Sequence, residues 1–316
     1  MGKTEIGWIG VGAMGKPMCL NLLRAGYSIT VYDKQPGRTD VVRQAGAAVA
    51  DSARELAAGA DVLFSTIFDD EGLRDIVQRK DGIAMGGRPG LLYVDMSTVS
   101  PAVSADVAAV LAGKDIQYLR APVSGTVTLA QDARLSTFVS GRREAFDGIR
   151  PILQCLTAKQ LYVGPGEEAR VVKLMINLMV FMSTAVIGEA LGFGSRLGLD
   201  RGVMLDAIND SIVGSPHYAV KASKLQQREY SPAGSIDLVM KDMDLALAVA
   251  RQGGTPMPIS ALVRQYLSVL QHRGMNQLDV AVLADALELM SGDIQDADIL
   301  PPTNREAAGR TPPLSS

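Results

Sequence analysis

The sequence predicts an α/β fold, with a doubly wound parallel sheet in the N-terminal half followed by an all-α C-terminal domain. Three observations support this prediction: short apolar runs alternate with helical segments, a glycine-rich turn follows the first run, and a long apolar helix begins near residue 167. Strict alternation of strand and helix requires crossover connections, which place helices on both faces of a parallel sheet. We expect domains at residues 1–164 and 165–292, and a disordered tail at 293–316.

The composition is that of an ordinary globular protein and excludes several classes. The 316 residues are 47% hydrophobic, and 31 basic against 34 acidic side chains give a net charge of −3. This balance gives no electrostatic attraction to nucleic acid or to an anionic membrane. Two cysteines and two histidines suffice for neither a disulfide framework nor a histidine-rich metal site, so we expect no metal. The absence of a signal-peptide pattern favours a cytoplasmic protein.

Apolar, β-branched runs are the expected strands of the sheet. The four principal ones are Ile6–Ile9, Ser28–Tyr32, Asp61–Thr66 and Leu91–Asp95. Two shorter runs that add further strands are Tyr118–Leu119 and Thr137–Val139. The helical segments between and after the strands are Pro17–Ala25, Ser52–Ala58, Glu71–Val77 and Val103–Ala112. Residues 151–163 then bring this domain to its end.

A glycine-rich turn joins the first strand to the first helix. It reads Gly10-Val11-Gly12-Ala13-Met14-Gly15 and matches the pattern G-x-G-x-x-G. In that pattern the first glycine allows a tight turn, the second lets the backbone approach a pyrophosphate, and the third lets helix and strand pack closely. The N-terminus of the following helix then presents N–H groups to the phosphates. A plain strand–turn–helix corner is the alternative, but strand, turn and a later acid together favour a Rossmann-type dinucleotide-binding domain.

Asp33 is that acid, and it closes the second strand. A carboxylate at this place accepts the hydroxyls of the adenosine ribose and repels a 2′-phosphate, which favours NAD. Lys34 and Arg38 follow closely and could receive that phosphate, so NADP remains possible. A solvated strand end is the alternative interpretation of Asp33.

A long helix is expected from Glu167-Glu168 onward, with acidic residues at its positive end. From Val171 to Phe193 it is apolar nearly all round, which requires burial by protein or lipid. The longest charge-free run, Leu174–Gly188, has 15 residues, fewer than the roughly 18 that indicate a membrane span. We therefore expect burial by protein, between domains or subunits.

Lys173 and Asn177 interrupt this helix. They are four residues apart, so they share a face. A lysine near the start of a helix can extend its ammonium to solvent, or it can serve catalysis. Its place directly after a cofactor domain favours catalysis, because ligands bind where domains meet.

The remaining C-terminal segments are expected to be helical. His217 follows Gly214-Ser215-Pro216 in an expected loop, where it either lies at the surface or faces a ligand. The expected helices are Ile236–Ala250, Ile259–Gln271 and Asp279–Met290.

These motifs together resemble the β-hydroxyacid dehydrogenases, the 3-hydroxyisobutyrate dehydrogenase family, from about residue 6 to about residue 290. Residues 10–18 with Asn21-Leu22 are similar to the family's extended cofactor signature. Residues 95–101 resemble its Ser-Thr turn, which implies that Thr98 meets the nicotinamide end of the cofactor. Lys173 with Asn177 resembles its catalytic lysine and supporting asparagine.

The resemblance extends to two further segments. Residues 121–125, Ala-Pro-Val-Ser-Gly, resemble the substrate-carboxylate loop, which implies that Ser124, Gly125 and Thr126 bind substrate, with Asn177 as a further substrate residue. Lys241 lies in a segment like the one whose lysine reaches the cofactor site. The loop after the third main strand adds Ile67 and Phe68 as expected cofactor contacts.

Several positions depart from the family pattern. Arg120 replaces an aspartate and Thr126 a glycine in the substrate loop, while Phe68-Asp69 replaces Leu-Pro. Glu167 and Ala169 replace glycines ahead of the lysine, and Ile176 replaces the first of two asparagines. We expect the family's reaction to be retained despite these changes, and the substrate pocket to differ from the one usual in the family.

The resemblance implies an NAD(P)-dependent oxidoreductase acting on a small 3-hydroxy acid or its semialdehyde, with Lys173 as general acid and base. Burial and the charge of the oxidised nicotinamide would lower the pKa of Lys173, and a bound substrate carboxylate would raise it. The alternatives are an imine reductase on the same scaffold and a non-catalytic dinucleotide-binding protein. Lys173 and Ser124 argue against the first, and the presence of Lys173 argues against the second. The apolar helical domain predicts a homodimer or homotetramer.

Overall fold

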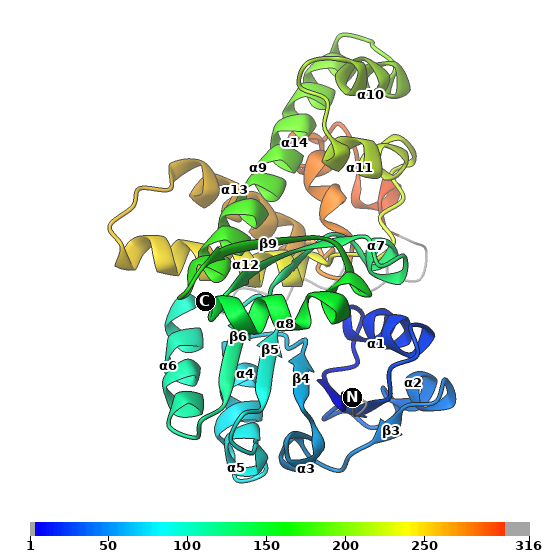
Figure 1. The fold of residues 1–316 in the computed structure, drawn as a ribbon. Helices are drawn as coiled ribbons and strands as arrows, with labels where there is room; N and C mark the ends of the chain where they lie inside the picture. The colour runs from blue at the N-terminus through cyan, green and yellow to red at the C-terminus, as the bar shows by residue number, and fades with distance from the viewer. Residues whose placement is uncertain (1–3, 301–316) are drawn as a thin grey trace, which may run out of the picture. The chain divides into compact units, whose positions relative to one another are not determined.

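The computed structural model describes residues 4–300. The chain divides into two compact units, Met1–Leu174 and Met175–Ser316, which we describe one at a time (Figure 1). The division falls within the long helix α9 (Glu168–Arg196).

Unit 1 is built on a nine-stranded sheet. Its strands are β1 Ile6–Ile9, β2 Ile29–Tyr32, β3 Ala48–Val49, β4 Val62–Ser65, β5 Leu92–Asp95, β6 Gln117–Arg120, β7 Val123–Ser124, β8 Leu135–Ser140 and β9 Thr157–Gly164. Their order is β3-β2-β1-β4-β5-β6-β8-β7, with β9 paired to β8. β1 to β6 pair in parallel, whereas β8 runs antiparallel to β6 and β7. The predicted parallel sheet is confirmed.

Helices cover both faces of this sheet (Figure 1). One face packs against α1 (Gly15–Arg24), α2 (Asp40–Gln44) and α8 (Arg143–Gln154). The other packs against α3 (Ala53–Gly59), α4 (Asp70–Gln78), α5 (Ile83–Gly86) and α6 (Pro101–Ala112). Neighbouring strand residues alternate between these two cores: Trp8 stacks on Phe64 at 5.3 Å in the first, and Ile9 lies in the second. This burial on both faces explains why the strands read as continuous apolar runs.

The direction of strand addition reverses between β1 and β4. From β1 the chain builds β2 and β3 on one side, then crosses to build β4, β5 and β6 on the other. In such sheets ligands bind at the carboxyl ends of the strands beside this switch point. Gly10 follows β1 and Thr66 follows β4, so the glycine-rich turn lies at this edge of the sheet.

The named secondary-structure elements among the described residues of unit 2 are all helices, as predicted. Besides most of α9 it contains α10 Arg201–Asp210, α11 Pro216–Gln227, α12 Ile236–Gln252, α13 Pro258–His272 and α14 Ala286–Ser291. The predicted helix at Asp279–Met290 differs in detail, because its first half is the 3₁₀ helix η1 (Val280–Asp285). Buried Asp285 and Glu288 both pair with Arg201 there, which ties η1 and α14 to α10.

The prediction of disorder from residue 293 onward is wrong for residues 293–300. Arg196 donates to the carboxylate of Asp293, from Nε to Oδ2 at 3.0 Å and from Nη2 to Oδ1 at 2.9 Å and to Oδ2 at 2.8 Å. A second 3₁₀ helix, η2 (Asp296–Asp298), follows, and Ile299 and Leu300 are buried. Local composition failed here because the segment is held by two buried apolar residues and by two arginines elsewhere in the chain, Arg196 and Arg273, which pair with Asp293 and Asp296. The rest of the predicted tail, 301–316, lies outside the described residues.

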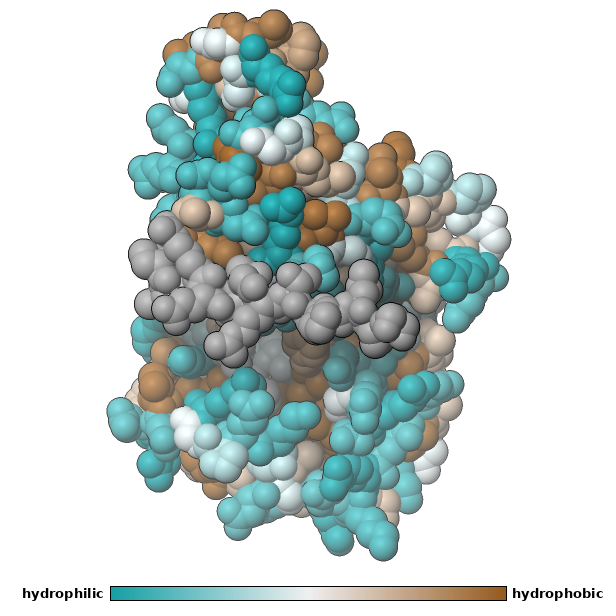
Figure 2. Space-filling view, turned by 180° about the vertical axis from the view of Figure 1, so that it is seen from behind, coloured by the Kyte–Doolittle hydropathy of each residue, from teal (hydrophilic) through white to brown (hydrophobic). Residues whose placement is uncertain are grey.

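Within the single chain, one face of helix α9 is exposed, so the expected burial of this face by another subunit stays a prediction. Five apolar side chains four or seven residues apart lie exposed along one face: Val171, Met175, Met179, Val186 and Phe193. Further exposed apolar residues, Leu197, Leu199 and Val203, lead into α10, where Figure 2 shows apolar side chains gathered at the top of the view. By length and composition α9 passes the test for a membrane span, a test that core helices of globular proteins also pass.

Candidate active site

The glycine-rich turn is closed by contacts that leave no room for side chains at its two ends. Gly10 has φ of 88°, and a Cβ placed on it would lie 2.2 Å from the carbonyl oxygen of Thr66. A Cβ on Gly15 would lie 2.0 Å from the carbonyl oxygen of Gly10. That oxygen accepts hydrogen bonds from Thr66 Oγ1 at 2.6 Å and Trp8 Nε1 at 3.1 Å. The turn is therefore anchored to the ends of both β1 and β4.

Gly15→Ala is expected to abolish high-affinity dinucleotide binding while leaving a folded protein. The added methyl meets backbone of the turn itself, so the turn must shift, and its N–H groups move with it. We expect NADH affinity to fall at least about tenfold, measured by fluorescence titration. Gly59→Ala is the matched control, because a Cβ there meets nothing within 4 Å. Unchanged affinity in Gly15→Ala would contradict the assignment of this turn to the cofactor.

Asp33 lies beside the turn, as the sequence predicts. The N–H of Val11 donates to Asp33 Oδ2 at 2.8 Å, and the N–H of Gln35 donates to Oδ1 at 2.8 Å. Arg38 is exposed, and its Nη1 lies 3.8 Å from the position of a Cβ on Gly12. Both an acid and a cation thus border the turn. Ala13 is exposed and Met14 directly precedes α1, so residues 10–15 fit the backbone cradle that a pyrophosphate requires.

The ends of β4 and β5 are joined by hydrogen bonds. The N–H of Ile67 donates to Ser97 Oγ at 2.7 Å, and Ser97 Oγ donates to Asp95 Oδ1 at 2.5 Å. Thr98, half-buried, follows Ser97 directly. Phe68 is 57% exposed, and the next residue, Asp69, caps α4 by accepting the N–H of Gly72. Asp69, the second residue of this departure from the family pattern, therefore stabilises the start of α4.

The predicted carboxylate loop connects β7 to the short helix α7 (Val127–Gln131). Ser124 is half-buried and ends β7, and Gly125 has φ of 141°. Thr126 caps α7, because its hydroxyl accepts the N–H of Leu129 at 3.3 Å. Asn21, a residue of the extended signature, donates to the carbonyl of Ala130 at 2.7 Å and so ties α1 to α7. The roles of Ser124, Gly125 and Thr126 toward substrate remain predictions.

Two of the departures from the family pattern are partners. Arg120 at the end of β6 forms an ion pair with Glu167, directly before α9. Both side chains are largely buried, at 9% and 20% exposure, and the guanidinium also lies 4.5 Å above the ring of Tyr118. The positive charge of Arg120 is thus balanced within the protein, which explains how a cation is accommodated at this position.

Lys173 lies in the first turns of α9 and is half-buried. Arg170, three residues before it, is completely buried and pairs with Asp95 at 2.5 Å. The sequence analysis missed Arg170, because nothing in its spacing distinguishes it from a solvated helix residue.

In unit 2 a single carboxylate connects two predicted site residues. Asn177 Nδ2 donates to Asp242 Oδ2 at 2.7 Å, and Lys241 Nζ lies 2.7 Å from Asp242 Oδ1. Asp242 is only 5% exposed. Asp242 was not among the predicted site residues, although its place directly after Lys241 in α12 was a usable signal.

His217 is not in a loop as predicted. Ser215 caps α11 by accepting the N–H of Tyr218, and Pro216 occupies the first turn, so His217 is helical. Its Nε2 lies 3.0 Å from Thr184 Oγ1 on α9. Burial, aided by the charge of Lys221, lowers the pKa of His217 from its usual value. A proline in the first helical turn explains the error, since Ser-Pro was interpreted as a turn rather than a helix start.

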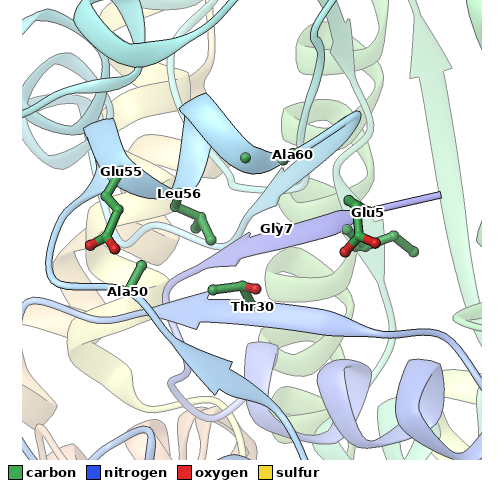
Figure 3. A pocket seen from close by; sticks show the side chains of 9 residues that line it. Glu5, Gly7, Thr30, Ala50, Glu55, Leu56 and Ala60 are labelled. Atoms are coloured by element: carbon green, nitrogen blue, oxygen red, sulfur yellow. The ribbon is translucent and has the colours of Figure 1, made fainter. Parts of the chain in front are cut away.

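A cavity of about 300 Å³ lies elsewhere in unit 1, between α3 and the β1–β2 pair (Figure 3). It is lined by residues such as Glu5, Thr30 and Glu55, and by none of the predicted site residues. Among residues 4–300 no group of three or more His, Cys, Asp or Glu side chains is placed to hold a metal ion.

A parallel sheet with a glycine-rich turn at its switch point and an acid at the next strand end defines a dinucleotide-binding protein of the Rossmann type. Comparison with family models agrees with this class. Residues 5–164 match the NAD-binding domain of 6-phosphogluconate dehydrogenase, and residues 168–287 match the NAD-binding region of NADP-dependent 3-hydroxyisobutyrate dehydrogenase. The chain is thus an NAD(P)-binding protein.

Individual relatives point to one family. The chain is 30% identical to 2-(hydroxymethyl)glutarate dehydrogenase of Eubacterium barkeri, over 92% of this chain and 97% of that protein. It is 28% identical to chloroplastic glyoxylate/succinic semialdehyde reductase 2 of Arabidopsis thaliana, over 91% and 80%. The solved structure of Mycobacterium tuberculosis 3-hydroxyisobutyrate dehydrogenase with L-serine has a TM-score of 0.82 and 25% identity, covering 90% of this chain and 99% of that one. The protein belongs to the β-hydroxyacid dehydrogenase family.

Proposed function

We propose that this protein transfers a hydride between NAD(P) and a small 3-hydroxy acid or its semialdehyde, with Lys173 handling the proton. The observation that supports this best is a hydrogen bond within unit 1. Arg170, one turn before Lys173, donates to the carbonyl of Ser97, the residue directly before Thr98. The start of the lysine-bearing helix is therefore fixed to the turn that is expected to meet the nicotinamide.

The roles of the chain's residues follow from their chemistry. Backbone N–H groups of residues 10–15 would hold the pyrophosphate, and Asp33 the ribose. Ile67, Phe68, Thr98 and Lys241 complete the proposed cofactor contacts. When bound at these residues, the nicotinamide would supply the hydride chemistry.

Other residues are proposed to transfer the proton and to bind the substrate carboxylate. Lys173 hydrogen-bonds the reacting oxygen of the substrate, taking its proton on oxidation and returning it on reduction. Ser124, with the N–H groups of Gly125 and Thr126, holds the carboxylate through charge-assisted hydrogen bonds. Asn177 is proposed to orient the substrate.

The decisive experiment is an absorbance screen at the reduced-nicotinamide band. Purified protein is tested with NAD and NADP against a panel of hydroxy acids, and with NADH and NADPH against the matching semialdehydes. We expect turnover with a carboxylate-bearing substrate. Cyclic imines in the same panel test the imine-reductase alternative, and turnover with imines alone would contradict the proposal. Absence of turnover with every compound would favour a non-catalytic role.

NAD is the proposed preferred cofactor because Asp33 repels a 2′-phosphate. Asp33→Asn keeps an oxygen for the N–H of Val11 and removes the charge, so we expect the ratio of kcat/KM for NADH over NADPH to fall about tenfold or more. Arg38→Ala serves as the counterpart and should leave NADH kinetics unchanged. A wild-type preference for NADPH that Arg38→Ala abolishes would overturn the proposal.

We also propose that the protein is a cytoplasmic homo-oligomer. The exposed apolar face of α9, with Met179 at 61% and Phe193 at 72% exposure, supports a protein partner for this helix. Met179→Glu is expected to shift the mass measured by light scattering toward the monomer. A wild-type protein that is monomeric at micromolar concentration would contradict the proposed oligomer.

A further inference from the structure

A completely buried arginine connects four elements of unit 1 at the proposed active site. Arg170 on α9 uses all three of its side-chain nitrogens. Nε donates to Ser104 Oγ on α6 at 3.1 Å, and Nη1 donates to the carbonyl of Ser97 at 2.8 Å. Nη2 donates to Asp95 Oδ2 at 2.5 Å and to Tyr118 Oη at 2.7 Å. Neither Arg170 nor Asp95 has any exposed side-chain surface.

The acceptor groups lead directly to residues of the proposed mechanism. The Ser97 carbonyl belongs to the peptide bond that joins Ser97 to Thr98. Asp95, the partner in the ion pair, also accepts the hydroxyl of Ser97, which in turn accepts the N–H of Ile67. Arg170 itself lies one helical turn before Lys173. A single guanidinium thus fixes the proposed proton-handling helix to both loops that border the proposed nicotinamide site.

A buried ion pair such as Arg170–Asp95 contributes little net stability, which argues that Arg170 has another role. Removing two charges from water costs free energy that their attraction often fails to recover, so buried ion pairs are poor stabilisers compared with apolar packing. An arginine is suited to this place because its planar fork offers five donors in fixed directions. A lysine offers one nitrogen, which cannot reach acceptors on separate elements at once.

We propose that Arg170 is a positioning residue for hydride transfer, holding Lys173 in register with the Ser97–Thr98 turn. This inference rests on the proposed function. It assigns to Arg170 no contact with substrate or cofactor. Loss of Arg170 should therefore lower kcat through a misplaced Lys173, with little change in how tightly cofactor and substrate bind.

The test measures three variants, Arg170→Gln, Lys173→Ala and the double variant. Misplacement of a catalytic group by about 1 Å can cost about 100-fold in rate, so we expect kcat in Arg170→Gln to fall about 10- to 100-fold. The Kd for NADH and the KM for substrate should stay within about threefold. The double variant should be no slower than Lys173→Ala alone, because a positioning residue has nothing left to position.

A purely structural role predicts a different pattern. Leu111→Ala, in the same core layer at the far end of α6, creates a buried cavity and lowers the thermal midpoint without touching this network. Assayed well below that midpoint, it should keep wild-type kcat. Arg170→Lys preserves the charge and should recover less than half of the lost rate, because one nitrogen cannot bond all four acceptors.

Wild-type kcat in folded Arg170→Gln, or losses that multiply in the double variant, would overturn the inference while leaving the proposed function intact. Full recovery by Arg170→Lys would show that charge alone matters and would also overturn it. If Arg170→Gln does not fold, the same kcat and double-variant criteria are applied to Arg170→Lys. If neither folds, the pair is a stabilising element and the inference is wrong. A wild-type protein without turnover contradicts the proposed function instead.

Discussion

Replacement of Lys173 by alanine is expected to lower kcat by about 10²- to 10⁴-fold, the usual contribution of a positioned acid or base. The ammonium is the only proposed group that can exchange a proton with the reacting oxygen, and a methyl leaves that oxygen unassisted. NADH binding should stay within a few fold of the wild type, because the pyrophosphate and ribose contacts lie on other elements.

Arginine at the same position should fail as well. Its guanidinium keeps the positive charge but cannot lose a proton near neutral pH, so it can hydrogen-bond but cannot act as a base. A variant that recovers activity with arginine would show that electrostatic stabilisation outweighs proton transfer. Stopped-flow absorbance at the reduced-nicotinamide band would measure this directly.

Lys159→Ala is the matched control, because Lys159 is an exposed lysine on β9. It should retain full turnover, which excludes a general effect of lost positive charge. Near-normal kcat in Lys173→Ala would end the assignment of Lys173.

The parallel part of the sheet was predictable because each of its strands is signalled by residues within one short stretch of the chain. Strands buried on both faces read as apolar runs such as Ile6–Ile9, and a glycine-rich turn separates this first strand from the first helix. Several elements were not predicted: β7 has two residues and α7 five, too few for any periodicity to show, and the longer α8 and β9, of 12 and 8 residues, were not assigned either. His217 was placed in a loop because a serine–proline pair signals both turns and helix starts.

The candidate site was predictable only where its residues lie close together in sequence. The turn at 10–15 carries its own spacing, but its closing contacts come from Thr66, far along the chain. Arg120 and Glu167 each look like an isolated departure from the family pattern, and their sequence separation of 47 positions hides that they pair. Hydrogen bonds between distant segments leave no spacing signal, and Arg170 with Asp95 is the clearest case.

That last pair also supports the prediction with the largest effect on stability. Asp95→Ala is expected to lower the free energy of unfolding by about 3–5 kcal/mol, because it leaves the Arg170 guanidinium buried without a counter-charge. The hydroxyls of Ser65 and Ser97, which both donate to Asp95 Oδ1, lose their acceptor at the same time. Urea denaturation of the cofactor-free protein would measure the change.

Asp61→Ala provides the contrast within the same sheet. Asp61 pairs with Arg88 at the surface, where the two side chains are 45% and 54% exposed, so its loss should cost less than about 1 kcal/mol. Asp95→Ala with Arg170→Met should recover much of the stability lost in Asp95→Ala alone, since the double variant removes the stranded charge. If Asp95→Ala lowers the free energy of unfolding no more than Asp61→Ala does, water or another group must reach the Arg170 guanidinium. The description of Arg170 as completely buried in its hydrogen-bond network would then be incorrect.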